Sequence, residues 1–181
     1  MERFPSIGIY EVITPAVEEV AEVARKRVGV IGTPSTVGSG VYKRLLKEKR
    51  KDLKVLQKAT PLLVPLVEEG ITEGPIAETV LKHYLFGWKD EIDTLLLGCT
   101  HYPLLEGTIK RLFPHWDLVN SASPLAEKLS KDLTFGGENR VHLFFSDRNT
   151  FLEEMVKRIP LRGEIKGIEF FSWEKVVIGD F

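Results

Sequence analysis

The chain has 181 residues, 43% of them apolar, which is enough for one ordinary domain or for one domain and part of a second. Its 25 Lys and Arg residues nearly balance 26 Asp and Glu residues, and a net charge of −1 gives no support to a nucleic-acid or membrane-surface role. A single cysteine excludes an intrachain disulfide framework and a cysteine-rich zinc site and fits a cytoplasmic protein, and no apolar run reaches membrane-spanning length.

The first two thirds of the chain alternate expected strands with expected helices. Apolar runs predict strands over residues 7–13 and 28–31, and helical spacing predicts a helix over 15–26 with Thr14 as its cap. A turn of small residues at 32–40 follows. Further strands are expected at 52–56, 93–97 and 116–119, and further helices at 41–51, within 60–70, at 75–85 and from 103 to about 113.

This alternation predicts an α/β fold, a three-layer, mostly parallel sheet with helices on both faces. The helix over 75–85 is expected to turn Ile76, Val80, Leu81 and Tyr84 inward. From residue 121 the organisation changes. The elements expected there are a helix at 123–133, strands at 141–145 and 168–171, and a helix that begins at Asn149.

The turn at 32–40 holds three glycines and several hydroxyl residues between a strand and a helix. Its glycine spacing fits neither the dinucleotide-binding motif nor the P-loop, so a small carboxylate is a better candidate ligand than a phosphate. Backbone N–H groups and hydroxyls of such a turn can bind an anion. An ordinary strand-to-helix connection is the alternative, because short Gly/Ser-rich turns are common.

Cys99 and His101 follow directly after the apolar strand expected at 93–97. In open α/β sheets ligands bind outside the carboxyl ends of the strands, where both side chains would lie. A nearby helix N-terminus and a charged imidazole both favour a thiolate. The alternative is that Cys99 is a small buried hydrophobe and that His101 is structural.

Three stretches resemble the glutamate racemases of the aspartate/glutamate racemase family. LLLGCTHYPLL at 95–105 resembles the second active-site motif, and VGVIGTPSTVGSGVYKRLL at 28–46 resembles the segment that precedes it. PLLVPLVEEG at 61–70 resembles the stretch in which a glutamate supports the histidine of that motif, and Glu68 occupies the matching position. Thr60 stands where many members carry a cysteine, a difference that we interpret as peripheral to the chemistry.

The resemblance implies a reaction that uses two opposed cysteines and neither pyridoxal phosphate nor metal. One thiolate removes the α-proton of glutamate, and the other thiol returns a proton on the opposite face. It implies that Cys99 is the acid/base on one face and that His101 and Glu68 tune its protonation. It further implies that Thr100, His101 and Thr33 bind the carboxylate or ammonium groups of the substrate.

The resemblance begins part-way through the family pattern. Members have two similar α/β domains with the substrate between them, and the motifs of the first domain, an aspartate–serine pair and a cysteine followed by asparagine and threonine, do not occur here. Residues 1–120 are therefore expected to form the second domain. Residues 121–181 match the segment that in the family packs on the other domain, so we expect it to pack differently, to swap or to form a homodimer.

The resulting hypothesis is a glutamate racemase-like isomerase of peptidoglycan precursor synthesis, and thus of cell wall biogenesis and cell shape. It would act in the cytoplasm on glutamate and would bind neither nucleic acid nor membrane. We expect the chain to be truncated and nearly inactive alone. One alternative is a non-catalytic fragment that binds glutamate or a partner subunit. Another is a one-cysteine enzyme, such as a decarboxylase-like relative, in which a single thiol protonates one face of an enolate.

Overall fold

A computed structural model of the chain describes residues 9–132, 140–145, 156 and 164–170. The chain divides into two compact units, Met1–Thr134 and Phe135–Phe181. Helix α7, Ala122–Asp132, therefore belongs to the first unit, and the division follows this helix instead of preceding it at residue 120. None of the helices in the described part of the chain is both long and apolar enough to cross a membrane.

A four-stranded, fully parallel sheet forms the centre of the first unit. Its strands are β1 (Arg27–Gly32), β2 (Lys54–Ala59), β3 (Thr94–Leu97) and β4 (Asp117–Asn120). They lie in the order β2-β1-β3-β4, so β1 and β3 are neighbours at the centre. This arrangement confirms the expected parallel α/β fold and places the ends of β1 and β3 side by side.

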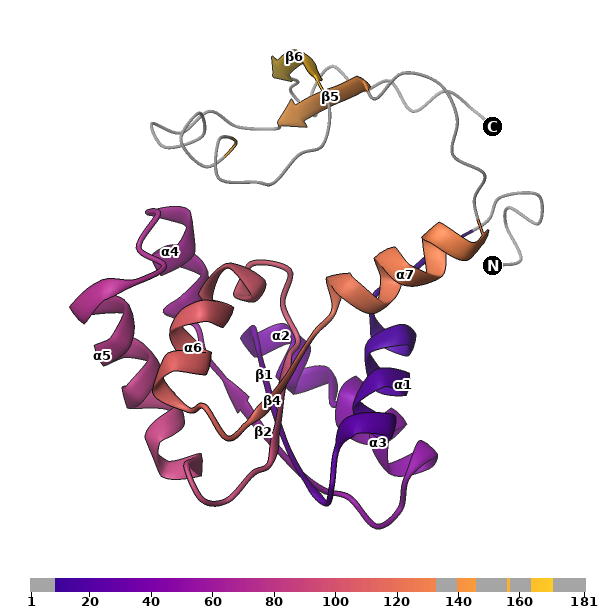
Figure 1. The fold of residues 1–181 in the computed structure, drawn as a ribbon, viewed down its shortest axis with the longest axis vertical. Helices are drawn as coiled ribbons and strands as arrows, with labels where there is room; N and C mark the ends of the chain where they lie inside the picture. The colour runs from indigo at the N-terminus through magenta and orange to yellow at the C-terminus, as the bar shows by residue number, and fades with distance from the viewer. Residues whose placement is uncertain (1–8, 133–139, 146–155, 157–163, 171–181) are drawn as a thin grey trace. The chain divides into compact units, whose positions relative to one another are not determined.

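Helices cover both faces of this sheet (Figure 1). One face carries α1 (Ile13–Val23) and α3 (Val41–Lys49). The other carries α4 (Leu63–Glu68), α5 (Gly74–Leu85) and α6 (Glu106–Leu112). Three short helices occupy connections, namely α2 (Pro34–Ser39), η1 (Phe86–Trp88) and η2 (Tyr102–Leu105).

The central strands β1 and β3 are apolar on both sides because each side packs on a helical layer. In β1, Val30 points toward α1 and α3, whereas Ile31 points toward α4, α5 and α6. In β3, Leu96 belongs to the first of these clusters and Leu97 to the second. These four side chains are fully buried, and the three-layer prediction is confirmed.

The strand expected at 7–13 is wrong for the residues that the structure describes. Residues 9–12 are irregular, and α1 already begins at Ile13. The Glu11 carboxylate accepts hydrogen bonds from the N–H groups of Ile13 and Thr14, so Glu11 supplies the capping that we expected from Thr14. Residues 7 and 8 lie outside the described residues.

Three of the four residues expected to face inward on α5 do so: Leu81 is buried, and Val80 and Tyr84 are partly buried against the same apolar cluster. Ala77, Leu81 and Leu85 are buried, whereas Ile76 is 60% exposed. These three residues are spaced by four, so they form one stripe of the helix that faces the sheet. Ile76 precedes that stripe and points to solvent.

The second unit contains two described strands that pair in parallel, β5 (Arg140–Phe145) and β6 (Glu164–Phe170). Their register shifts between Val141 and His142. Both expected strands are therefore present, and β6 begins four residues before the predicted start at 168. Of the helix expected from Asn149, Val156 is helical and the other positions lie outside the described residues.

Candidate active site

The turns that follow β1 and β3 leave the same edge of the sheet. Ile31 lies opposite Leu97 in the parallel register, and the chain continues from these residues to Thr33 and Cys99. After β1 the chain passes outward to β2, and after β3 it passes outward in the other direction to β4. In open α/β sheets ligands bind at the carboxyl ends of the strands where the connections diverge in this way, so this edge is the candidate ligand site.

Two glycines are closely packed at this edge of the sheet. Gly98 donates its N–H to the carbonyl of Ile31 at 2.8 Å. A Cβ on Gly98 would lie 2.9 Å from that carbonyl oxygen and 3.0 Å from Cε2 of Tyr42, and a Cβ on Gly32 would lie 3.0 Å from Cγ2 of Thr36. Backbone atoms of β1 and of the turn after β3 therefore pack directly against each other here, and Cys99 is the next residue after Gly98. The sequence prediction gave Gly98 no role.

Cys99, His101 and Glu68 form a chain of contacts at this edge. The Cys99 Sγ lies 3.8 Å from Nδ1 of His101, and the His101 Nε2 lies 3.4 Å from Oε1 of Glu68, the last residue of α4. A carboxylate at one ring nitrogen fixes the orientation of the imidazole and leaves the other nitrogen facing the thiol. The structure thus brings together the three residues predicted to be catalytic.

The His101–Glu68 contact is solvent-accessible. The two side chains are 35% and 50% exposed, so their ion pair, present when His101 is protonated, stabilises the fold by roughly 0–1 kcal/mol. Cys99 is half-buried. These contacts contribute little to folding, and the sulfur is partly accessible. Both properties fit a chemical role, because a substrate must reach the sulfur.

The α-helix expected from residue 103 begins later. Tyr102–Leu105 is a single 3-10 turn, and the α-helix α6 starts at Glu106. The field of a helix N-terminus falls off within its first turn, so α6 stabilises a Cys99 thiolate less than we expected. This leaves the His101 imidazole ring, whose Nδ1 lies 3.8 Å from Sγ, as the nearer group to the thiol.

Thr33 is placed at the site edge, although its hydroxyl is already engaged. It caps α2 by accepting the N–H of Thr36 at 3.2 Å, and its Oγ1 lies 3.0 Å from Oγ1 of Thr36. Thr36, which the sequence prediction did not include, shares this hydroxyl pair. Thr100 is exposed beside Cys99. The substrate-binding roles of Thr33, Thr100 and His101 stay predictions.

Thr60 and Tyr102 lie fully buried beneath the Cys99–His101 turn. Their hydroxyl oxygens are 2.7 Å apart, and the Thr60 hydroxyl also donates to the carbonyl of Gly32 at 3.3 Å. Burial raises the pKa of Tyr102 to about 12, and the nearby Cys99 charge contributes. Tyr102 therefore stays a protonated donor at any physiological pH. No local pattern pairs two residues this far apart in sequence.

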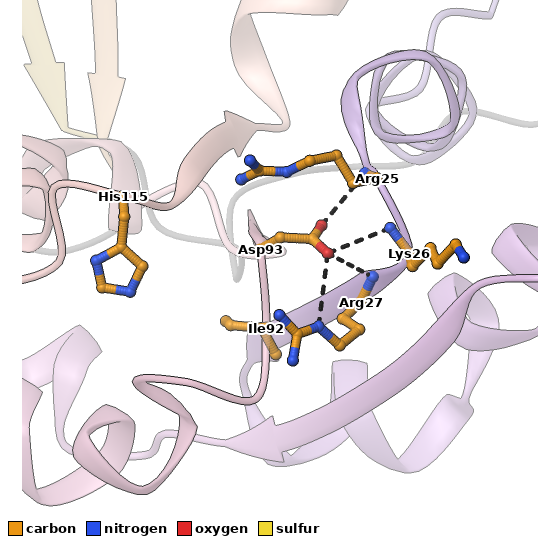
Figure 2. A pocket seen from close by; sticks show the side chains of 6 residues that line it. All are labelled: Arg25, Lys26, Arg27, Ile92, Asp93 and His115. Atoms are coloured by element: carbon orange, nitrogen blue, oxygen red, sulfur yellow. Dashed lines mark hydrogen bonds and ion pairs between the residues drawn. The ribbon is translucent and has the colours of Figure 1, made fainter.

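A second depression, of about 640 Å³, lies at the amino ends of the strands. Figure 2 shows Asp93 at its centre, surrounded by Arg25, Lys26, Arg27, Ile92 and His115. The Asp93 carboxylate accepts the backbone N–H groups of Arg25, Lys26 and Arg27 at 2.9 to 3.3 Å. The Asp93 carboxylate is therefore hydrogen-bonded to the backbone of the connection between α1 and β1. This depression lies at the opposite ends of the strands from Cys99 and is a separate feature.

Solved structures of amino-acid racemases match this fold. The glutamate racemase of Thermus thermophilus, in complex with β-chloro-D-alanine, has a TM-score of 0.77 and 33% identity, with 97% of this chain and 68% of that chain covered. The Francisella tularensis glutamate racemase, in complex with D-glutamate, has a TM-score of 0.79 and 28% identity, with 94% and 66% covered. No family model matches the chain.

The glutamate racemase of Aquifex pyrophilus is 44% identical over 155 residues, 85% of this chain and 60% of that protein. The chain belongs to the glutamate racemase family. It spans about 60% of the length of the curated relatives that it matches.

Proposed function

We propose that this chain carries one half of the proton-transfer machinery of a glutamate racemase, with Cys99 as its acid/base. The chain of contacts from Glu68 through His101 to Cys99, at the switch point of the sheet, supports the proposal most strongly. Its substrate is glutamate, which is bound in the related Francisella tularensis racemase as the D-isomer. The cellular context that we propose is peptidoglycan precursor synthesis in the cytoplasm.

In the proposed step the Cys99 thiolate removes the α-proton of glutamate. The Cα–H bond breaks, an S–H bond forms, and the electron pair passes into the α-carboxylate to give an enediolate. His101, oriented by Glu68, stabilises the thiolate before the step. Thr33, Thr100 and His101 are the candidates for holding the carboxylate and ammonium groups.

Return of the proton to the opposite face requires a second acid. The sequence has one cysteine, so we propose that water or a group outside this sequence protonates that face. Loss of one positioned acid/base group lowers the rate by about 10²–10⁴-fold. Exchange of the α-proton on the Cys99 face is therefore expected to exceed net racemisation by the chain alone.

The test follows both processes in heavy water. L-Glutamate is incubated with the chain, α-deuteration is measured by proton NMR, and conversion to D-glutamate is measured by circular dichroism. We expect deuteration that Cys99→Ala abolishes, with racemisation near the detection limit. Adding a separately expressed N-terminal domain from a related racemase should raise racemisation, provided that the two polypeptides associate.

Two results would redirect the proposal. Robust Cys99-dependent racemisation by the chain alone would place a second acid/base within this sequence or across a homodimer. Glutamate binding by calorimetry without any Cys99-dependent exchange would instead favour a non-catalytic binding protein. The Cys99→Ala variant controls for contaminating host racemase in both cases.

A further inference from the structure

We infer that Thr60 and Tyr102 are positioning residues that lock the Cys99–His101 turn onto the segment carrying Glu68. This inference rests on the proposed function for the meaning of the Cys99 chemistry, and its test needs no racemase activity. The Thr60–Tyr102 pair replaces our earlier interpretation of Thr60 as peripheral. Neither residue reaches the proposed substrate site, because both are fully buried.

The pair joins the two segments whose side chains must meet at the surface. Tyr102 follows His101 in sequence, and its N–H donates to the carbonyl of Cys99 at 3.1 Å. Thr60 begins the turn into α4, because its carbonyl accepts the N–H of Leu63 at 3.1 Å, and α4 ends at Glu68. One buried hydrogen bond therefore ties the Cys99–His101 turn to the α4 segment.

The pair is also hydrogen-bonded to the last residue of β1, Gly32. The backbone N–H and the hydroxyl of Thr60 both donate to the carbonyl of Gly32, at 2.9 and 3.3 Å. With that proton committed, Tyr102 O–H is the donor to Thr60, at 2.7 Å from Oγ1 and 3.1 Å from the carbonyl oxygen. Every hydroxyl proton then has an acceptor, which is the condition for a rigid buried network.

The structure explains why this rigidity matters for the relay above. The His101–Glu68 contact is half-exposed and weak, so it does not by itself fix the positions of the two side chains. The buried pair fixes the backbone from which both side chains project. Removing either hydroxyl should therefore loosen the placement of His101 against Cys99, even though the exposed residues are unchanged.

The test measures the rate at which iodoacetamide alkylates Cys99, the single cysteine of the chain, between about pH 6 and 9, where the thiolate is the reacting form. Thr60→Val, which keeps the shape and removes the hydroxyl, should slow alkylation below neutral pH by about three- to tenfold, a range that corresponds to coupling within one hydrogen-bond network. Tyr102→Phe should act in the same direction. Thr60→Ser, which keeps the hydroxyl, should restore the rate.

A double-mutant cycle separates positioning from general loosening. In a His101→Asn background, Thr60→Val should have little further effect on the alkylation rate, because the group that it positions is gone. Thr94→Val is the matched control: Thr94 is equally buried, and its hydroxyl donates to the Asp93 carboxylate at the opposite end of the sheet. It should leave the rate unchanged.

Several outcomes would overturn the inference. These are an unchanged rate in both Thr60→Val and Tyr102→Phe, the same fold-change in both backgrounds, an equal effect of Thr94→Val, or a loss in Thr60→Ser. Far-UV circular dichroism identifies any variant that does not fold, and Thr60→Ser then decides the question by its rate alone. A positive cycle without glutamate exchange would retain the positioning role and refute the proposed function.

Discussion

Cys99, His101 and Glu68 contribute less to the fold than the residues beneath them. The three side chains are half-buried or exposed, and their contacts are weak ones. Gly98 is the opposite case, because it has no space for a side chain between the Ile31 carbonyl and the Tyr42 ring. Residues proposed to act in catalysis and residues that stabilise the fold are therefore neighbours in the sequence, as Cys99 and Gly98 are, but they have different roles.

Gly98→Ala should destabilise the protein by about 1–3 kcal/mol, because the added methyl group overpacks a filled space. The free energy of unfolding in urea measures this cost. Gly107→Ala is the matched control, since a Cβ there meets nothing within 4 Å and the residue lies in α6. It should stabilise by about 0.4–1 kcal/mol. Equal effects of the two substitutions would contradict the packing argument.

Tyr42 predicts how the protein responds to alkali. Burial raises the pKa of Tyr42 from 10.0 to about 12, with smaller contributions from the Glu11 and Cys99 charges. Between these values the unfolded state has lost a proton that the folded state retains, so the free energy of unfolding falls as pH rises, by about 1.4 kcal/mol per pH unit for each such group. Tyr42→Phe should remove one group's share of this slope.

The measurement is urea unfolding at several pH values from about 9 to 12, a window set by the unperturbed tyrosine value and the Tyr42 shift. Tyr10→Phe, a change at an exposed tyrosine, is the control. A slope that is identical in Tyr42→Phe and in the unaltered protein would show that Tyr42 is not the titrating group.

The sequence allowed part of this site to be predicted. Cys99 and His101 could be selected because their chemistry follows a buried strand, and Glu68 only because of the family resemblance. The Thr60–Tyr102 bond joins residues 42 positions apart, so it depends on how α4 packs over the sheet. Gly98 likewise needs the position of Tyr42, which lies on another element.

At the scale of elements, Asp93 explains where α1 ends. We expected the helix to run to Lys26, but it ends at Val23. The N–H groups of Arg25, Lys26 and Arg27 turn toward the Asp93 carboxylate and cannot continue a helical ladder (Figure 2). A residue just before β3 therefore decides the connection between α1 and β1, which no reading of residues 13–27 alone could reveal.

Asp93→Asn should lower the free energy of unfolding by about 1–3 kcal/mol. The carboxylate accepts backbone N–H groups at both of its oxygens, whereas the amide has one acceptor oxygen. Urea unfolding measures it. Asp52→Asn, at an exposed carboxylate paired with Arg50, is the control and should change stability much less than Asp93→Asn. A comparable loss in both variants would mean that charge, not the buried bonds of Asp93, is responsible.

On the scale of the whole molecule, the chain contains two compact units, and the two large apolar clusters found among the described residues belong to the first. Every residue of these clusters lies between Ala16 and Val119. The alternating pattern of strands and helices was sufficient to predict this unit. It did not predict that α7 belongs to it, because the amphipathic pattern of a helix does not say which neighbour it packs on.

Residues 1–134 should therefore fold without residues 135–181. A shortened chain that ends at Thr134 is expected to keep its far-UV circular dichroism and to unfold in one cooperative urea transition, because no member of either cluster is removed. The full chain is the reference. Loss of cooperativity in the shortened chain would show that the first unit depends on the second.

The close packing of Gly32 and Gly98 beside the Cys99 turn has a consequence for how this protein can evolve. Gly32 and Gly98 are closely packed, whereas Thr100, His101 and Glu68 are exposed or half-buried, so we expect the fold to tolerate substitution at these three positions. A mutational library sorted only for cellular abundance should therefore retain glycine at position 98 and accept many residues at position 101. Selection for folding and selection for catalysis therefore act on different positions. Residues that carry a new reaction can be substituted on this scaffold while the protein stays folded.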